Sequence, residues 1–248
     1  MAAQPSFERR ALIVATVCTV VGLLFQIVAI CTNNWLVLSI PGGVYRNASR
    51  RYLVQAFSGL WRICRVEVSR LVADGKTVET RHDECESHNL FPSEDEIRQN
   101  KAIDSHYLDG PNELIKIDYT RTAIAFTIIA LILMVIGHMF AVYTLKRPRY
   151  IIKRLTALLH LMTAACILVL NEVFSRSVEH GLENLPDKYP QGVESSYGFS
   201  YVFSWLVFVV YVTAGLLFLF ISHKRKADMA DTVDVMAEQD EPMQLGRV

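Results

Sequence analysis

The sequence predicts an all-α membrane bundle of four transmembrane helices, with a small antiparallel β-sheet outside the membrane. Two observations support this. The apolar residues, 52% of the 248-residue chain, are gathered into four long blocks. A polar interval with strand-like segments and two cysteines separates the first two blocks. A helix of roughly 17–25 apolar residues crosses a hydrocarbon core of about 30 Å, so each block is long enough to span a membrane.

The predicted spans are residues 11–31, 122–145, 155–171 and 197–222. Polar side chains are few inside them. Gln26 lies midway along the first span, and we expect it to hydrogen-bond a neighbouring helix. His138 and His160 lie in the second and third spans. An ionisable residue at membrane depth indicates a functional site, but a neutral histidine that hydrogen-bonds across the bundle serves packing equally well.

Basic residues predict the orientation. Arg9 and Arg10 precede the first span, residues 146–154 contain five basic residues, and residues 224–226 are Lys-Arg-Lys. These three segments share one side by helix count, and basic short loops face the cytoplasm. We therefore expect residues 1–10, 146–154 and 223–248 to be cytoplasmic, and residues 32–121 and 172–196 to be extracellular. The acidic segment 223–248 lacks aromatic residues, so we expect it to be disordered.

The first extracellular loop carries strand signals. Residues 33–40 read as a strand ended by a turn at Pro41-Gly42-Gly43. Segments 51–55 and 59–68 read as further strands, and Asp74-Gly75 is a hairpin signal. Asn47-Ala48-Ser49 is a sequon, so Asn47 is a predicted glycosylation site. The carboxylates of the loops are interpreted as solvated surface.

Five cysteines are present, and two of them lie in this loop. An oxidising compartment favours a disulfide between Cys64 and Cys85, which we expect to tie neighbouring strands. Metal binding by this pair with His82 and His88 is the alternative, although the spacing lacks the close ligand pairs of zinc sites.

The outer ends of the third and fourth spans are candidates for partner contact. Residues 172–183 could continue the third span outward as a helix. Glu172 and Arg176 would then share a helix face, where they could pair; the alternative is that Glu172 only marks the membrane boundary. Aromatic residues crowd the outer end of the fourth span, namely Tyr197, Phe199, Tyr201, Phe203 and Trp205. They fit an aromatic belt at the headgroup level, with a docking stripe as the alternative.

Motifs for catalysis are absent from the sequence. It contains no Gly-rich phosphate loop, no His-Glu-x-x-His and no Gly-x-Ser-x-Gly. Too few polar residues converge at membrane depth for a channel or transporter. We expect no enzyme activity, no cofactor, no metal and no nucleic-acid partner; the lipid bilayer is the expected surroundings.

Several residues together resemble one family. Trp35, Gly59-Leu60-Trp61, Cys64, Cys85 and Arg121 match the first-loop pattern of the four-helix claudin superfamily, which includes the calcium-channel gamma subunits and the AMPA-receptor regulatory proteins. Residues 59–64 and 171–178 look most like the skeletal-muscle type of voltage-gated calcium-channel gamma subunit. The chain departs from the regulatory proteins and claudins at its end, Leu-Gly-Arg-Val, which lacks their tail motifs.

The resemblance implies a function at the plasma membrane. It implies an auxiliary subunit that binds the pore-forming subunit of a voltage-gated calcium channel and modulates its gating or trafficking. Two alternatives stay open: an auxiliary subunit of an ionotropic glutamate receptor, and a claudin-like adhesion or barrier protein. The expected contact residues are Glu172, Arg176, Tyr197, Phe199 and Tyr201.

Overall fold

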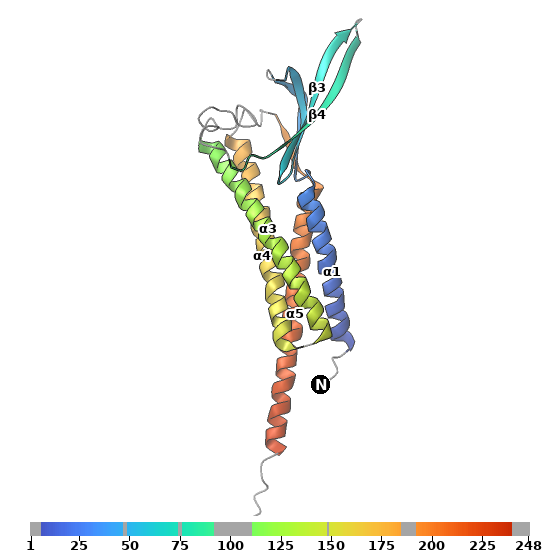
Figure 1. The fold of residues 1–248 in the computed structure, drawn as a ribbon, viewed down its shortest axis with the longest axis vertical. Helices are drawn as coiled ribbons and strands as arrows, with labels where there is room; N and C mark the ends of the chain where they lie inside the picture. The colour runs from blue at the N-terminus through green and yellow to red at the C-terminus, as the bar shows by residue number, and fades with distance from the viewer. Residues whose placement is uncertain are drawn as a thin grey trace, which may run out of the picture.

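The computed structural model describes residues 6–46, 49–73, 76–91, 111–147, 149–184 and 192–239. Within these residues, four long helices form a bundle that carries a five-stranded sheet at one end (Figure 1). The helices are α1 (Ser6–Cys31), α3 (Pro111–Lys146), α4 (Tyr150–Asn184) and α5 (Phe199–Gln239). All four are long and apolar enough to cross a membrane. The predicted fold class is confirmed.

The bundle is a ring of four helices. α3 packs on α4, α4 packs on α5, and α1 packs on α5 and α3. Side chains of alanine line the contact at the end away from the sheet, including Ala15, Ala141, Ala157 and Ala214. Small residues let transmembrane helices approach closely, and dispersion then holds them together.

Two of the buried polar side chains, His160 and Gln26, lie in the bundle without a hydrogen-bond partner for their side-chain nitrogen and oxygen atoms. His160 is fully buried, and its ring lies 5.5 Å from the rings of Tyr211 and Phe218 and 6.3 Å from that of His138. Gln26 is also fully buried, yet neither of its amide atoms has a hydrogen-bond partner in the described chain. The interhelical hydrogen bond expected for Gln26 is therefore not formed among the described residues.

All four helices extend beyond the predicted spans, and α1 does so by beginning at Ser6. α4 continues through Asn184, as expected for residues 172–183. α3 begins at Pro111, eleven residues before the predicted span; proline is tolerated in the first helical turn because its missing N–H would have no partner there. α5 continues to Gln239 and leaves the bundle, where the sequence predicted a disordered tail (Figure 1). The costly nucleus of a helix is already formed in the membrane, so propagation needs no further burial of apolar surface.

The sheet has the order β4-β3-β2-β1-β5, and every neighbouring pair is antiparallel. Its strands are β1 (Leu36–Arg46), β2 (Arg51–Ser58), β3 (Arg62–Ala73), β4 (Lys76–Ser87) and β5 (Glu194–Tyr197). β5 comes from the loop between α4 and α5 and was missed in the sequence, because four residues reading Glu-Ser-Ser-Tyr carry no strand signal. It pairs with β1 and connects the two loops.

The turn predicted at Pro41-Gly42-Gly43 is wrong. β1 runs through these residues with a shift of register between Ser39 and Val44, which is a bulge. Gly42 and Gly43 have φ of 82° and 72°, and glycine adopts this left-handed region without steric cost.

The predicted hairpin between β3 and β4 is supported by Ala73 of β3, which lies opposite Lys76 of β4. Asp74-Gly75 and Asn47 lie outside the described residues.

One carboxylate expected at the surface is buried in the sheet. Glu67 on β3 is 1% exposed, and its Oε1 lies 3.0 Å from Nη1 of Arg46. Arg51 lies 4.0 Å from the other oxygen of Glu67 and 2.9 Å from Glu84. Strand pairing brings these charges together, and a buried carboxylate is tolerated only when it is paired in this way.

Trp35 joins the sheet to the bundle. Its side chain is fully buried, and its Nε1–H donates a hydrogen bond of 2.7 Å to the carbonyl of Ala29 near the end of α1. The ring lies 5.0 Å from that of Phe174 on α4 and 6.2 Å from that of Tyr201 on α5. One side chain thus contacts three helices at the end of the bundle that carries the sheet.

The backbone beside Trp35 continues this joint. The amide of Trp35 donates to Ser58 at 3.1 Å, and its carbonyl accepts from Gly198 at 3.0 Å. A Cβ at Gly198 would overlap the carbonyl oxygen of Asn34, so only glycine fits at this close approach. β2 and the start of α5 are therefore held against the same residue.

Replacing Trp35 with alanine should loosen this joint. Deleting a buried tryptophan costs about 3–5 kcal/mol, and the carbonyl of Ala29 loses its donor. We expect the apparent melting temperature of the detergent-solubilised protein to fall by about 10 °C. Fluorescence-detected size exclusion after heating measures it. Trp61→Ala is the matched control, because Trp61 is 37% exposed; equal losses in the two variants would contradict the role of Trp35.

Candidate docking surface

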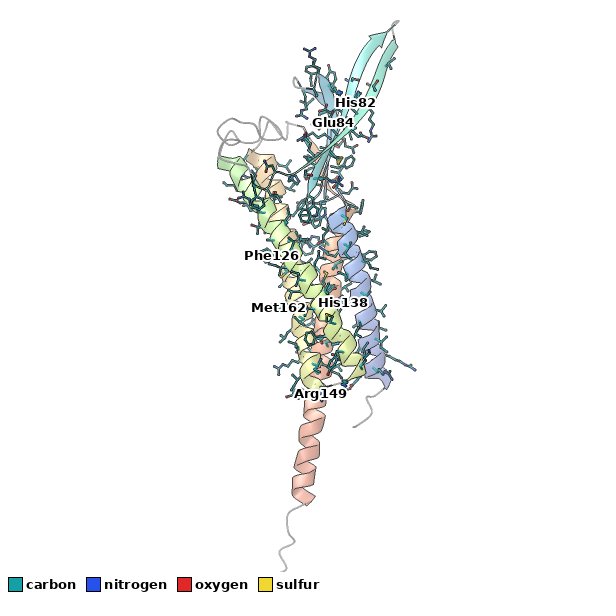
Figure 2. All side chains as sticks on the ribbon, in the orientation of Figure 1. His82, Glu84, Phe126, His138, Arg149 and Met162 are labelled. Atoms are coloured by element: carbon teal, nitrogen blue, oxygen red, sulfur yellow. A yellow bond between two sulfur atoms is a disulfide. The ribbon has the colours of Figure 1, made fainter. Side chains whose placement is uncertain are left out.

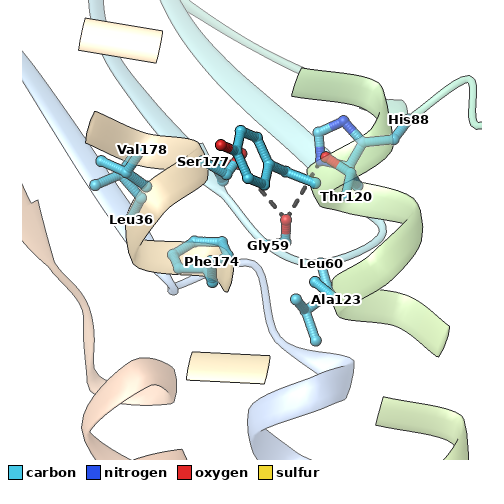
Figure 3. A pocket seen from close by; sticks show the side chains of 11 residues that line it. Leu36, Gly59, Leu60, His88, Thr120, Ala123, Phe174, Ser177 and Val178 are labelled. Atoms are coloured by element: carbon cyan, nitrogen blue, oxygen red, sulfur yellow. Dashed lines mark hydrogen bonds between the residues drawn. The ribbon is translucent and has the colours of Figure 1, made fainter. Parts of the chain in front are cut away.

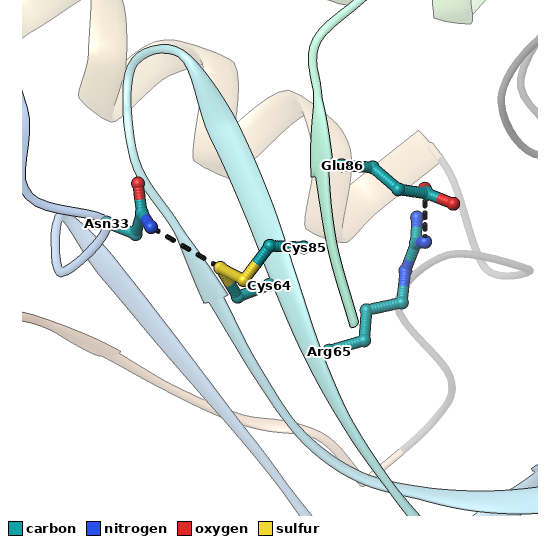
Figure 4. The surroundings of a disulfide bond; sticks show 5 residues. All are labelled: Asn33, Cys64, Arg65, Cys85 and Glu86. Atoms are coloured by element: carbon teal, nitrogen blue, oxygen red, sulfur yellow. Dashed lines mark hydrogen bonds and ion pairs between the residues drawn. A yellow bond between two sulfur atoms is a disulfide. The ribbon is translucent and has the colours of Figure 1, made fainter. Parts of the chain in front are cut away.

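The two loop cysteines form a disulfide that ties the outer hairpin. Cys64 on β3 lies directly opposite Cys85 on β4, and the two sulfur atoms are bonded (Figure 4). Asn33, at the end of α1, donates a hydrogen bond of 3.3 Å from Nδ2 to the sulfur of Cys64. The predicted pairing between neighbouring strands is confirmed.

The alternative of a metal site at these cysteines does not hold, because both sulfurs are used by the disulfide. The two histidines have other neighbours. His82 lies 3.3 Å from the hydroxyl of Ser69, and His88 lies 3.3 Å from the carbonyl of Gly59. They stabilise the sheet rather than converge on one point.

The Gly59-Leu60-Trp61 motif lies where the sheet meets the helices (Figure 3). A Cβ at Gly59 would lie 2.9 Å from Cα of Asn33 and from the carbonyl oxygen of Thr32, so glycine is required there. Leu60 is 2% exposed and belongs to the core around Trp35. Trp61 instead faces outward. The cavity beside this motif has a volume of about 30 Å³, the space of one water molecule, and is too small for an organic ligand.

Arg121 fastens the end of the first loop to α3. Its Nε donates to the carbonyl of Leu90, its Nη1 lies 3.0 Å from Asp118, and its guanidinium lies 5.1 Å from the centre of the Phe91 ring. The arginine that the family resemblance singled out thus holds the segment after β4 beside the helix.

The structure divides the predicted aromatic stripe into two rows. The first row contains Tyr197, Tyr201 and Trp205, with ring centres 4.3 and 6.3 Å apart. The hydroxyl of Tyr197 lies 3.0 Å from that of Ser175 on α4. This row therefore lies over the junction between α5 and α4, and Tyr197 remains 45% exposed.

The second row faces α1. Phe199 packs on Phe203 at 5.7 Å, and Phe203 stacks on Phe25 of α1 at 5.1 Å. Phe199 is thus separated from the other expected contact residues, because side chains two positions apart on a helix point in different directions.

Glu172 and Arg176 do not form a close ion pair. Arg176 pairs with Glu179 instead, with Nη1 and Oε2 2.7 Å apart. Residues three apart on a helix are neighbours as well as residues four apart, and Glu179 takes the guanidinium at the solvent-facing end. Glu172 is exposed and has no ion-pair partner among the residues that the structure describes.

Glu172 lies at the end of an exposed stripe on α4, here called the α4 face. The stripe consists of Leu155, Leu158, Met162, Leu168, Glu172 and Arg176. Met162, near its middle, is 55% exposed and lies on the outer side of the bundle (Figure 2). The face is apolar at membrane depth and charged beyond it, which suits contact with another membrane helix that has a polar outer end.

The geometry defines a class of protein, namely a multi-pass membrane protein whose four helices carry a disulfide-linked sheet at one end. The family described as PMP-22/EMP/MP20/Claudin tight junction matches residues 20–220, and the chain belongs to this family. The family description and the names of the relatives are those of junction, membrane and channel-subunit proteins, not of enzymes.

The relatives include calcium-channel subunits. The chain is 25% identical over 213 residues to the voltage-dependent calcium channel gamma-1 subunit of Sus scrofa, which covers 84% of this chain and 87% of the relative. The Homo sapiens gamma-1 subunit is also 25% identical, with 84% and 86% covered. Human epithelial membrane protein 2 is 31% identical over 72 residues, which is 29% of this chain and 42% of the relative.

Removing the disulfide should destabilise the sheet. Cys64→Ser with Cys85→Ser opens a loop with a sequence separation of 21, which costs about 3 kcal/mol in the chain-entropy model. We expect faster proteolysis within residues 62–87 and less protein at the cell surface. Cys31→Ser, a change at an exposed free cysteine, is the matched control. Peptide mapping without reduction that found Cys64 and Cys85 as free thiols would rule the bridge out.

Proposed function

We propose that this protein is a non-catalytic auxiliary subunit of a voltage-gated calcium channel and modulates the gating of the pore-forming subunit. It would act in the plasma membrane with both termini in the cytoplasm. The gamma-1 relatives, which match along most of the chain, support the class of partner. The clusters of basic residues at the end of the bundle away from the sheet support the orientation.

The observation that carries the proposal is the carboxylate of Glu172. It is exposed, it makes no ion pair within 4.0 Å among the described residues, and its attraction to Arg176 acts only at longer range. Voltage-sensing helices are rich in arginine, and a carboxylate at this depth is complementary to them. Arg176 is bonded to Glu179, so the carboxylate of Glu172 keeps its close contacts available for a cation of a partner.

Modulation follows from unequal binding to two channel states. A subunit shifts a gating equilibrium only when it contacts one state better than the other, and a preference of about 1.4 kcal/mol shifts the equilibrium tenfold. Leu158 and Met162 would supply contact in both states, since apolar packing changes little when a helix slides. Glu172 would supply the preference, because an arginine approaches it in one position of the sensor and leaves it in another.

Charge reversal at Glu172 should remove the preference of the subunit for one gating state of the channel. Glu172→Lys, co-expressed with a voltage-gated calcium channel, should cancel a shift of activation or inactivation midpoint that the wild-type subunit produces. The change should be on the order of 10 mV, because an ion pair of about 1 kcal/mol acts on a sensor that moves 3–4 charges at about 2.3 kcal/mol per charge per 100 mV. Patch-clamp recording measures the midpoint.

Glu179→Lys is the matched control. It makes the same charge change two helical turns further out, at a side chain paired with Arg176. Surface labelling and co-purification verify that each variant reaches the membrane with the channel. An unchanged midpoint for Glu172→Lys, with both proteins together at the surface, would dismiss the docking role. Co-purification of a glutamate receptor, or of further copies from the adjoining cell, would favour the two alternative functions instead.

The orientation has its own test at Asn47. If the sheet is extracellular, Asn47 carries one N-glycan. Asn47→Gln and Ser49→Ala both destroy the sequon, and both should migrate in gel electrophoresis like wild-type protein treated with a glycosidase. If glycosidase treatment does not change the gel migration of wild-type protein taken from the cell surface, Asn47 carries no glycan, and this contradicts the proposed orientation.

A further inference from the structure

A groove lies between α1 and α5 at the end of the bundle away from the sheet. It has a volume of about 600 Å³ and opens outward from the bundle. Its lining is apolar apart from one cation, and comprises Phe7, Arg10, Ala11, Val14, Ala15, Cys18, Val210, Thr213, Ala214 and Leu217. The hydroxyl of Thr213 donates to the carbonyl of Val210 at 2.9 Å, so it offers the groove no unsatisfied donor.

Two alanines form part of the floor of the groove, and the close approach of the helices at a glycine bounds one end of it. Ala15 and Ala214 form part of its floor and are 8% and 4% exposed. Gly22, one turn beyond Cys18, brings the helices together, since a Cβ there would lie 3.3 Å from the ring of Tyr211. The groove is therefore bounded toward the middle of the membrane and open toward the N-terminal end of α1.

The length of the groove matches one leaflet. Phe7 and Cys18 lie eleven residues apart on α1, which is about 16 Å along the helix. Half of a hydrocarbon core of about 30 Å is about 15 Å. A chain that fills this groove has the length of one acyl chain, and it would lie parallel to the helices.

Arg10 marks the headgroup end. It is exposed, lines the groove and has no ion-pair partner among the described residues. Its neighbour Glu8 turns the other way and is 7% exposed, with Oε2 4.0 Å from Nζ of Lys153. The groove thus presents a guanidinium at the membrane surface above an apolar channel.

We propose that this groove binds one anionic glycerophospholipid of the leaflet at the N-terminal end of α1. The phosphate would lie at Arg10, and an acyl chain would fill the space from there to Cys18, about 12 Å along α1. This inference does not depend on the calcium-channel partner, and the proposed orientation only names the leaflet as cytoplasmic. α1 lies diagonally across the bundle from α4, because each packs on both α3 and α5, so the lipid and the α4 face do not compete.

Native mass spectrometry of the full chain in detergent tests the proposal. The probes are palmitoyl-oleoyl phosphatidylserine and the matching phosphatidylcholine. We expect phosphatidylserine to bind more tightly, and Arg10→Ala to weaken it about fivefold. Arg9→Ala should weaken it less than twofold, because Arg9 does not line the groove. Equal effects of the two substitutions would show a general surface attraction and overturn the site.

A second pair of variants tests the acyl chain. Val14 and Val17 are 60% and 56% exposed, but only Val14 lines the groove. Val14→Phe should reduce the binding of both lipids, and Val17→Phe should leave it unchanged. Equal binding in the two variants would indicate ordinary lipid contact and overturn the proposal, as would a sterol that displaces phosphatidylserine from the wild-type protein.

A measurement on wild-type protein covers the case in which a variant fails to fold. Cys18 lines the groove, whereas Cys31 is an exposed free cysteine outside it. Phosphatidylserine should slow the alkylation of Cys18 by N-ethylmaleimide and leave that of Cys31 unaltered. Unprotected Cys18 at a saturating lipid concentration would overturn the proposal.

Discussion

The contact that the rest of the structure depends on is the burial of Trp35 against the ends of three helices. Four residues separate the end of α1 at Cys31 from the start of β1 at Leu36, so the chain has little freedom there. The indole N–H is bonded to the carbonyl of Ala29, and the ring packs on Phe174 and Tyr201. A polar tip and a large apolar body suit a side chain at the boundary between membrane and water. The sheet therefore keeps one orientation on the bundle, and the surfaces beside it keep fixed positions.

The predictable parts of the molecule are those set by solvent and compartment. Long uncharged runs can be stable in lipid only as helices, since every backbone group must be satisfied within the segment. The disulfide follows from two cysteines outside the membrane. Local geometry set by tertiary contact was not predictable. β5 exists because β1 presents a free edge, Gly42-Gly43 forms a bulge because β2 continues beyond it, and Arg176 selects Glu179 over Glu172 by side-chain direction. Spacing alone allowed both pairings.

The two proposed binding surfaces differ in what they offer. The α4 face is convex and ends in a carboxylate that makes no close ion pair among the described residues, so it suits a helix that carries positive charge. The groove between α1 and α5 is concave and ends in the guanidinium of Arg10, so it suits an anionic chain molecule. They lie at opposite corners of the bundle, and their charged residues, Glu172 and Arg10, lie toward opposite ends of it. Occupation of one surface leaves the other accessible, which allows a docked subunit to remain in contact with the bilayer.

The rigidity of the sheet-proximal end of α4 strengthens the binding contribution that we propose for the Glu172 carboxylate. An isolated surface ion pair contributes about 0–1 kcal/mol, because water screens it and both side chains lose freedom. Docking against another helix removes part of that water and lowers the local dielectric, which strengthens the attraction. The α4 backbone beneath Glu172 is held by Phe174 against Trp35 and by Ser175 against Tyr197, so little further ordering is needed on binding. The joint at Trp35 thus connects the stability of the fold to the proposed contact.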